Sequence, residues 1–202
     1  RDNISIEQLA DVARDGSKID ANTYAEIILN LPGDTTEAHT QSLRDAVNTG
    51  LSYLRMYQLI LLPETDMNTR AQREQFNCAE VEEIVVAQDT MSFDDYIECR
   101  ELNLTVEIIH NAGLFRELYG LCQVDGLEWF ELLMRFHVKR NEYMPELYAQ
   151  FRQDTVAPLW DSRDQALAFA QSNLDDYLGE KLGTNELFAG KAVAFFTLQE
   201  QL

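Results

Sequence analysis

The residue types that most often carry out chemistry are few in this chain and widely spaced. Its cysteines, Cys78, Cys99 and Cys122, lie 21 and 23 residues apart and match no ligand spacing of a zinc or iron–sulfur motif. The histidines are equally scattered. We therefore expect the cysteines to be small buried side chains, and we expect no metal site built from this chain alone.

Acidic residues are numerous, but their spacing does not favour catalysis. Adjacent carboxylates such as Asp94 and Asp95 point about 100° apart on a helix, which indicates a solvated acidic face rather than an acid–base pair. The segment Pro32-Gly33-Asp34 has two interpretations. It is typical of a turn in which Asp34 caps a helix, and it also suits an anion held by helix-terminal N–H groups.

The overall charge excludes several kinds of partner. A formal charge of −19 and a pI near 4.3 oppose binding to nucleic acid or to an anionic membrane surface. No apolar run approaches the roughly 20 residues of a spanning helix, and no secretory signal is present, so we expect a cytoplasmic protein. Because the chain begins with Arg1, we also expect that it derives from a longer protein.

The first half of the chain predicts a strand–helix–strand unit. A short amphipathic helix at residues 5–15 is expected to stop at Gly16. An apolar strand around residues 27–29, buried on both faces, precedes a helix that Asp34 caps and Gly50 ends. A second apolar strand follows within residues 51–62, and the short connections predict that the two strands are parallel.

Beyond about residue 70 the pattern becomes helical. We predict a short helix at residues 69–77, a brief strand or extended connector near residues 81–86, and a long buried helix that Ser92 and Asp95 cap and that ends before Gly113. Five further amphipathic helices are expected at residues 114–121, 127–138, 144–151, 165–178 and 187–198. The predicted domains are residues 1–78 and an acidic helical region, residues 79–202.

Residues 26–34, EIILNLPGD, carry a family resemblance. They resemble the EIIlGLPGET segment on the fifth barrel strand of radical S-adenosylmethionine enzymes, especially those related to the cobalamin-binding members. The resemblance continues through EAHTQSLRDAVNTGLSYLRMYQLILLPETDM at residues 37–67 and EEIVVAQDTMSFDDYIECRELNLTVEI at residues 82–108, and RDNISIEQL precedes it. It spans about residues 1–112. Asn30 and Glu64 stand where the family pattern has glycine.

This resemblance implies an α/β fold, with half of a (β/α) barrel in residues 1–78 and a mainly helical C-terminal region. It also implies an enzyme whose full-length form holds S-adenosylmethionine and an iron–sulfur cluster. The CxxxCxxC ligands of that cluster are not in this chain, so the chain alone is expected to be inactive. Cobalamin is a further cofactor that the resemblance allows.

The resemblance also places candidate cofactor-binding residues. Glu26, Ile28 and Asn30 share one phase of the first strand, and they are expected to line the cofactor cavity if that side faces inward. On the second strand, Arg55 and Tyr57 share one face and Gln58 points to the other, so one face supplies a further cavity residue. We take Tyr57 and Gln58 as candidates. Catalytic residues and the substrate, a small molecule or a peptide, are not identified.

An alternative function comes from another class of protein. The helical part is then a protein-interaction or substrate-gating module and the barrel motif is vestigial, as side chains at Asn30 and Glu64 would suggest. In the half barrel, the strand edges left by truncation are expected to promote dimers or aggregation.

Overall fold

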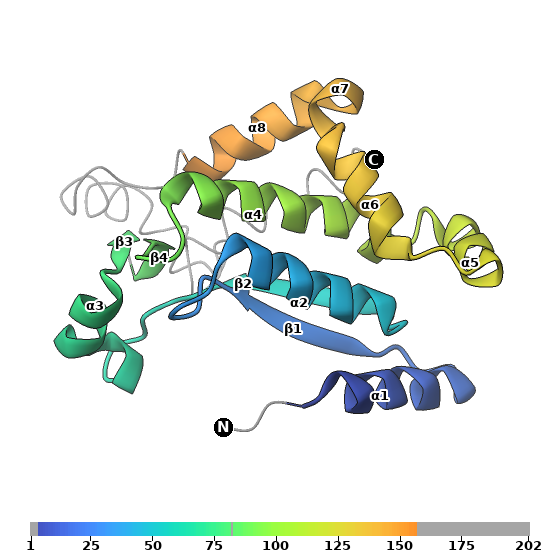
Figure 1. The fold of residues 1–202 in the computed structure, drawn as a ribbon, viewed down its shortest axis with the longest axis horizontal. Coiled ribbons are helices and arrows are strands. Elements are labelled where there is room, and N and C mark those ends of the chain that lie inside the picture. Colours follow the sequence, from blue (N-terminus) through green and yellow to red (C-terminus); the bar gives the residue numbers. More distant parts are fainter. Residues whose placement is uncertain (1–3, 82, 157–202) are drawn as a thin grey trace, which may run out of the picture. The chain divides into compact units, whose positions relative to one another are not determined.

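The computed structural model describes residues 4–81 and 83–156 (Figure 1). Residues up to Arg140 belong to one compact unit, and a second unit begins at Asn141. All candidate site residues lie in the first unit, which is described below.

A strand, a helix and a second strand carry the candidate residues. Strand β1 (Tyr24–Leu29) is followed by α2 (Thr36–Asn48) and β2 (Tyr53–Gln58), and β1 pairs with β2 in parallel. The predicted strand–helix–strand unit is therefore confirmed. Thr35, not Asp34, is the N-cap of α2, because its hydroxyl accepts from the Ala38 N–H. Gly50 follows the C-cap with φ +83°, as expected of a helix-ending glycine.

Helix α1 (Ile6–Lys18) does not stop where the sequence suggested. Ser5 begins it with a capping box, but Gly16 lies inside the helix. A Cβ at Gly16 would overlap the Thr23 methyl and approach the Ala21 carbonyl oxygen to 3.3 Å. Gly16 therefore allows the chain to turn back closely against α1, and the predicted stop at this glycine is wrong.

After β2 the chain changes from parallel to antiparallel pairing. A short helical turn η1 (Asp66–Asn68) and α3 (Arg70–Phe76) precede the hairpin of β3 (Ala79–Val81) and β4 (Ile84–Ala87). Ile60 forms an isolated antiparallel bridge with Ile84. The short helix is confirmed, and the segment near residue 84 is a strand rather than a connector.

The long buried helix is also confirmed. Helix α4 (Phe93–Val106) begins with the Ser92–Asp95 capping box and continues as the π-helix η2 (Glu107–Asn111). Helices α5 (Arg116–Asp125), α6 (Trp129–Val138), α7 (Arg140–Tyr143) and α8 (Pro145–Val156) follow. The helices expected at 165–178 and 187–198 lie outside the described residues.

The expected half barrel is wrong. The described residues are mostly helical, and their strands are short and form two separate two-stranded sheets. The physical cause lies after β2, where the apolar run meets β4 in antiparallel orientation: Val85 N–H donates to Leu59 O at 3.0 Å and Leu61 N–H to Glu83 O at 2.7 Å. Sheet pairing thus ends in a hairpin instead of continuing with parallel strands.

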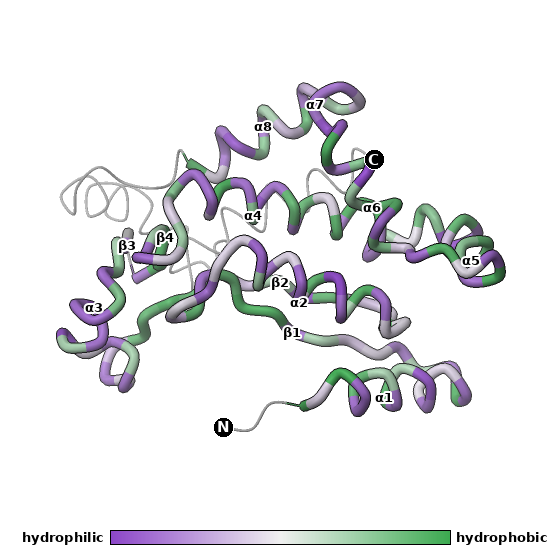
Figure 2. The backbone as a smooth tube through the Cα atoms, in the orientation of Figure 1, coloured by the Kyte–Doolittle hydropathy of each residue, from purple (hydrophilic) through white to green (hydrophobic). Residues whose placement is uncertain are grey.

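Only one face of the β1–β2 sheet is buried. Helix α2 packs against β1 and α4, as Figure 1 shows, and this layer buries Leu29, Leu43 and Leu54 completely. Figure 2 shows hydrophobic residues along the C-terminal half of β1. Even so, Tyr24 is 57 % exposed and Ile28 is 40 % exposed. The expectation that β1 is buried on both faces is therefore wrong.

The close approach at Gly16 makes a testable prediction. Ala normally stabilises a helix interior over Gly by about 0.5–1 kcal/mol, but overpacking costs about 1–3 kcal/mol. We expect Gly16→Ala to lower the free energy of unfolding in urea. Gly120→Ala in α5 is the matched control, because a Cβ there meets no atom within 4 Å, and it should raise the free energy. Equal gains from both substitutions would contradict the packing at Gly16.

Candidate functional site

Six side chains form the exposed side of the β1–β2 sheet, which we call the open face. Every second residue of β1 and of β2 belongs to this face. The residues pair in register: Tyr24 with Tyr53, Glu26 with Arg55, and Ile28 with Tyr57. Side chains of alternate strand residues share a face. None of the six is buried.

The open face combines opposite charges with aromatic surface. Glu26 and Arg55 are register partners on neighbouring strands, so their side chains emerge side by side. The Arg55 guanidinium carbon lies 5.2 Å from the centre of the Tyr24 ring. A hydrogen bond with Tyr57 raises the pKa of Arg55, which therefore stays charged. The face can thus offer one anionic group, one cationic group and a flat apolar surface to a single ligand.

A pocket of about 380 Å³ adjoins the open face where β1 ends. Glu26 and Ile28 belong to its lining, and the other lining residues come from β1, the following loop and α2: Ile27, Leu31, Pro32, Gly33, Asp34, His39 and Ser42. His39 is 1 % exposed, and its Nε2 lies 2.8 Å from Asn103 Oδ1. Burial lowers the pKa of His39, so the ring is neutral at pH 7.

Asn30 does not join Glu26 and Ile28. The strand ends at Leu29, and Asn30 has φ +70° with a completely buried side chain. Its Nδ2 donates to Val85 O at 2.9 Å, and its Oδ1 accepts from Gln88 Nε2 at 2.8 Å. Asn30 is therefore a structural link between β1 and β4, because a left-handed residue interrupts the strand alternation that would have turned it outward.

Gln58 is separated from the open face as well. It is 5 % exposed, and its Oε1 accepts a hydrogen bond from the buried Tyr96 hydroxyl. Tyr57, its neighbour, is on the open face opposite Ile28. Of the sequence-predicted site residues, the structure thus brings Glu26, Ile28 and Tyr57 together and places Asn30 and Gln58 elsewhere.

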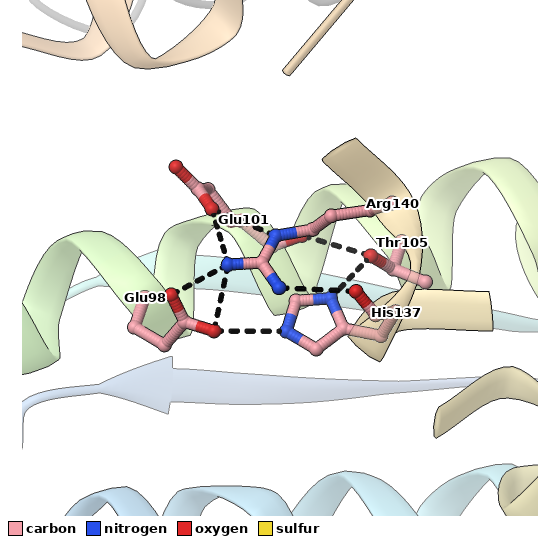
Figure 3. Close-up of polar contacts among 5 residues, drawn as sticks. All are labelled: Glu98, Glu101, Thr105, His137 and Arg140. Atoms are coloured by element: carbon pink, nitrogen blue, oxygen red, sulfur yellow. Dashed lines mark hydrogen bonds and ion pairs between the residues drawn. The ribbon is translucent and has the colours of Figure 1, made fainter. Parts of the chain in front are cut away.

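Sequence reasoning missed a cluster of polar residues between α4, the end of α6 and the first residue of α7 (Figure 3). Arg140 donates to Glu101 Oε2 at 2.8 Å and to both carboxylate oxygens of Glu98 at 2.8 and 2.6 Å. His137 lies 2.8 Å from Thr105 Oγ1 and 3.3 Å from Glu98 Oε1. The hydrogen bond from His137, followed by the charge of Arg140, lowers the pKa of Glu98.

One signal could have revealed part of this cluster. Glu98, Glu101 and Thr105 follow helical spacing, and Glu101 and Thr105 are buried on a helix that is buried on most sides after Asp95, which makes a polar partner necessary. The sequence could not identify Arg140 as this partner, because Arg140 lies about 40 positions further along the chain. The cluster joins α4, α6 and α7 and does not line the pocket beside β1, so we assign it to the scaffold.

The cysteines do not fit an iron–sulfur cluster. Cys99 and Cys122 are buried, and burial raises the pKa of Cys99 to about 12, which opposes the thiolate form that a metal needs. Within residues 4–81 and 83–156, no group of three or more His, Cys, Asp or Glu side chains is arranged to hold a metal ion. A cluster would need ligands from other polypeptide.

No family model matches this chain, and a search of curated proteins found no match. Among the described helices, none combines the length and apolar character required to cross a membrane.

The ion pairs of Arg140 lead to a stability prediction. Breaking a buried ion pair costs about 3–5 kcal/mol, because the other charge stays buried. Glu101 is 3 % exposed, so Arg140→Met should lower the free energy of unfolding by about this amount. Arg70→Met is the control, since Arg70 and Glu74 form an exposed pair worth about 0–1 kcal/mol. Similar small losses in both variants would rule out a stabilising role for the cluster.

The buried His39 gives a pH prediction. Its pKa is lower in the folded chain than the unfolded value near 6.5, so the unfolded chain binds more protons as the pH falls. Its contribution is fully present above pH 6.5 and declines as the pH drops towards the folded pKa. We expect the free energy of unfolding to fall less between pH 7 and pH 5 in His39→Gln than in wild type. Parallel curves in urea titrations would contradict this.

Proposed function

We propose that the open face binds S-adenosylmethionine in a radical S-adenosylmethionine enzyme of which this chain is one part. The observation that carries the proposal is the pairing of Glu26 with Arg55 beside Ile28 and Tyr57 on two parallel strands. Ligands of α/β sheets commonly bind near the carboxyl ends of parallel strands, and Ile28 lies one residue before the end of β1.

The chemistry of the ligand matches the groups on this face. S-adenosylmethionine has a flat adenine ring, a sulfonium, and an ammonium and a carboxylate on one carbon. Arg55 suits the carboxylate, because a guanidinium can donate two parallel hydrogen bonds to it. Glu26 suits the ammonium, and Ile28 with Tyr57 suits the adenine. These residues would bind and orient the cofactor.

Backbone geometry also supports the family resemblance. Asn30 and Glu64, two positions where the family pattern has glycine, have φ +70° and +62°. Glycine adopts this left-handed conformation freely, and Asn is the side chain that tolerates it best. The two departures therefore keep a backbone that the glycines would favour, and Asn30 directs its side chain into the scaffold rather than towards a ligand.

The proposed enzyme needs further parts. When an iron–sulfur cluster reduces it, bound S-adenosylmethionine supplies a 5′-deoxyadenosyl radical that abstracts hydrogen from a substrate. The cluster ligands would come from polypeptide outside this sequence, and cobalamin use stays part of the proposal. The chain's acidic composition also leads us to propose that the enzyme does not bind nucleic acid. A cytoplasmic location is part of the same proposal.

The test is an assay of the full-length protein after anaerobic reconstitution of its cluster. We expect it to form 5′-deoxyadenosine from S-adenosylmethionine, and we expect Ile28→Asp to reduce the yield at least about tenfold, since a carboxylate would replace an apolar contact of about 1.5–3 kcal/mol. Ile19→Asp is the matched control, because Ile19 is 76 % exposed and lies outside the pocket. No product from a protein with an assembled cluster would overturn the proposal.

A second candidate function is a protein-interaction or substrate-gating module in the helical part. Helix α5 favours it, because Leu118, Leu121 and Val124 are 41 %, 61 % and 83 % exposed, whereas Cys122 on the same helix is buried. Exposed apolar patches often mark contact surfaces. Under this function, Leu121→Glu should abolish partner binding, and Ile28→Asp should leave it unchanged.

A further inference from the structure

The outer edge of β1 is open for pairing. Thr23 O accepts from Tyr53 N–H at 3.2 Å and Leu29 O from Leu59 N–H at 3.0 Å, so the odd-numbered residues of this segment bond towards β2. In a parallel ladder, the intervening residues direct their N–H and C=O groups to the opposite edge. Those residues are Tyr24, Glu26 and Ile28, and no described residue pairs with their backbones.

The outer edge of β2 is different. The side chain of Asn111 accepts from Leu54 N–H at 2.9 Å and donates to Leu54 O at 2.7 Å. One amide from η2 therefore satisfies both backbone groups that Leu54 directs away from β1. The sheet has one edge that a side chain covers and one edge that is available for another strand.

The pocket beside β1 provides room for side chains of such a strand. The pocket has a volume of about 380 Å³, and Glu26 and Ile28 of β1 belong to its lining. Ile27, Leu31 and Pro32 make part of the lining apolar. A strand that pairs with β1 would place alternate side chains on the open face and the others on the pocket side. Apolar side chains suit the pocket side.

Charge determines which strand fits. Glu26 is the central residue of the open edge, and its carboxylate is exposed. A second copy pairing antiparallel over the whole edge would place Tyr24 opposite Ile28 and Glu26 opposite Glu26, and like charges directly opposite destabilise a sheet. A Lys or Arg at that position would instead form an opposite-charge pair.

We propose that the edge of β1 is a strand-addition site for an extended segment with a basic residue opposite Glu26 and apolar residues on either side of it. Main-chain hydrogen bonds at the edge would give affinity, and Glu26 would select the partner strand. This inference shares Glu26 with the proposed S-adenosylmethionine site, but its test measures protection of the backbone amides of β1, so its failure is distinguishable from failure of the proposed function.

The test uses the whole 202-residue chain and an acetylated, amidated five-residue peptide, Thr-Val-Lys-Val-Thr. Amide hydrogen exchange by NMR is measured at Tyr24, Glu26 and Ile28. We expect exchange at these three amides to slow at least about fivefold at saturating peptide. The Thr-Val-Glu-Val-Thr peptide should bind about tenfold more weakly. A peptide N-methylated at all five residues should give no protection, because it cannot donate to the edge in either strand direction.

A charge-reversed variant completes the test. Glu26→Lys should prefer the Glu peptide, whereas Glu74→Lys, on the exposed surface of α3, should keep the wild-type preference. Binding of the N-methylated peptide as tightly as the parent peptide, or no protection at millimolar peptide, would overturn the proposal. Protection that grows with protein concentration and without peptide would also overturn it, by showing that a second copy covers the edge.

Discussion

Two buried amides, Asn30 and Gln88, tie β1 to the loop that follows it and to the β3–β4 hairpin. Gln88 Nε2 donates to Asn30 Oδ1 at 2.8 Å and to Leu31 O at 2.7 Å, and its Oε1 accepts from Gly33 N–H at 3.1 Å. Asn30 in turn donates to Val85 O on β4. Buried polar groups must be satisfied, so this network fixes where β1 ends, how the loop turns and where β4 lies. The open face and its pocket keep their geometry because that junction is fixed.

The sequence correctly predicted the features of the fold that follow from local rules. The strand–helix–strand order, the Gly50 helix end and the Ser92–Asp95 capping box all depend on residues within a few positions of each other. The half barrel was a different kind of prediction, since it required that sheet pairing continue in one direction. Whether residues after β2 pair parallel or antiparallel depends on β4, more than 20 positions away, and the antiparallel contacts with Ile84 and Val85 decided it.

The candidate site was predictable to the same extent. Period-two alternation correctly grouped Glu26 with Ile28 and set Tyr57 apart from Gln58. It failed at Asn30 because alternation holds only while the backbone remains extended, and Asn30 is left-handed. The interactions among Glu98, His137 and Arg140 were beyond sequence reasoning for another reason. Each residue reads locally as an ordinary polar helical position, and the cluster forms only because α6 packs against α4 and Arg140 follows at the start of α7.

The two kinds of carboxylate in this unit have different physical roles. Glu101 is buried and directly paired with Arg140, so its charge is already neutralised by the scaffold. Glu26 is exposed on a strand that has one free backbone edge, and its register partner Arg55 leaves the other side of the carboxylate open. A charge on an edge strand discourages indiscriminate sheet pairing and favours a complementary one. The Glu26 carboxylate can therefore have both effects. It limits aggregation at the β1 edge because of its position along the edge, and it contributes to binding on the open face because its side chain points to that face.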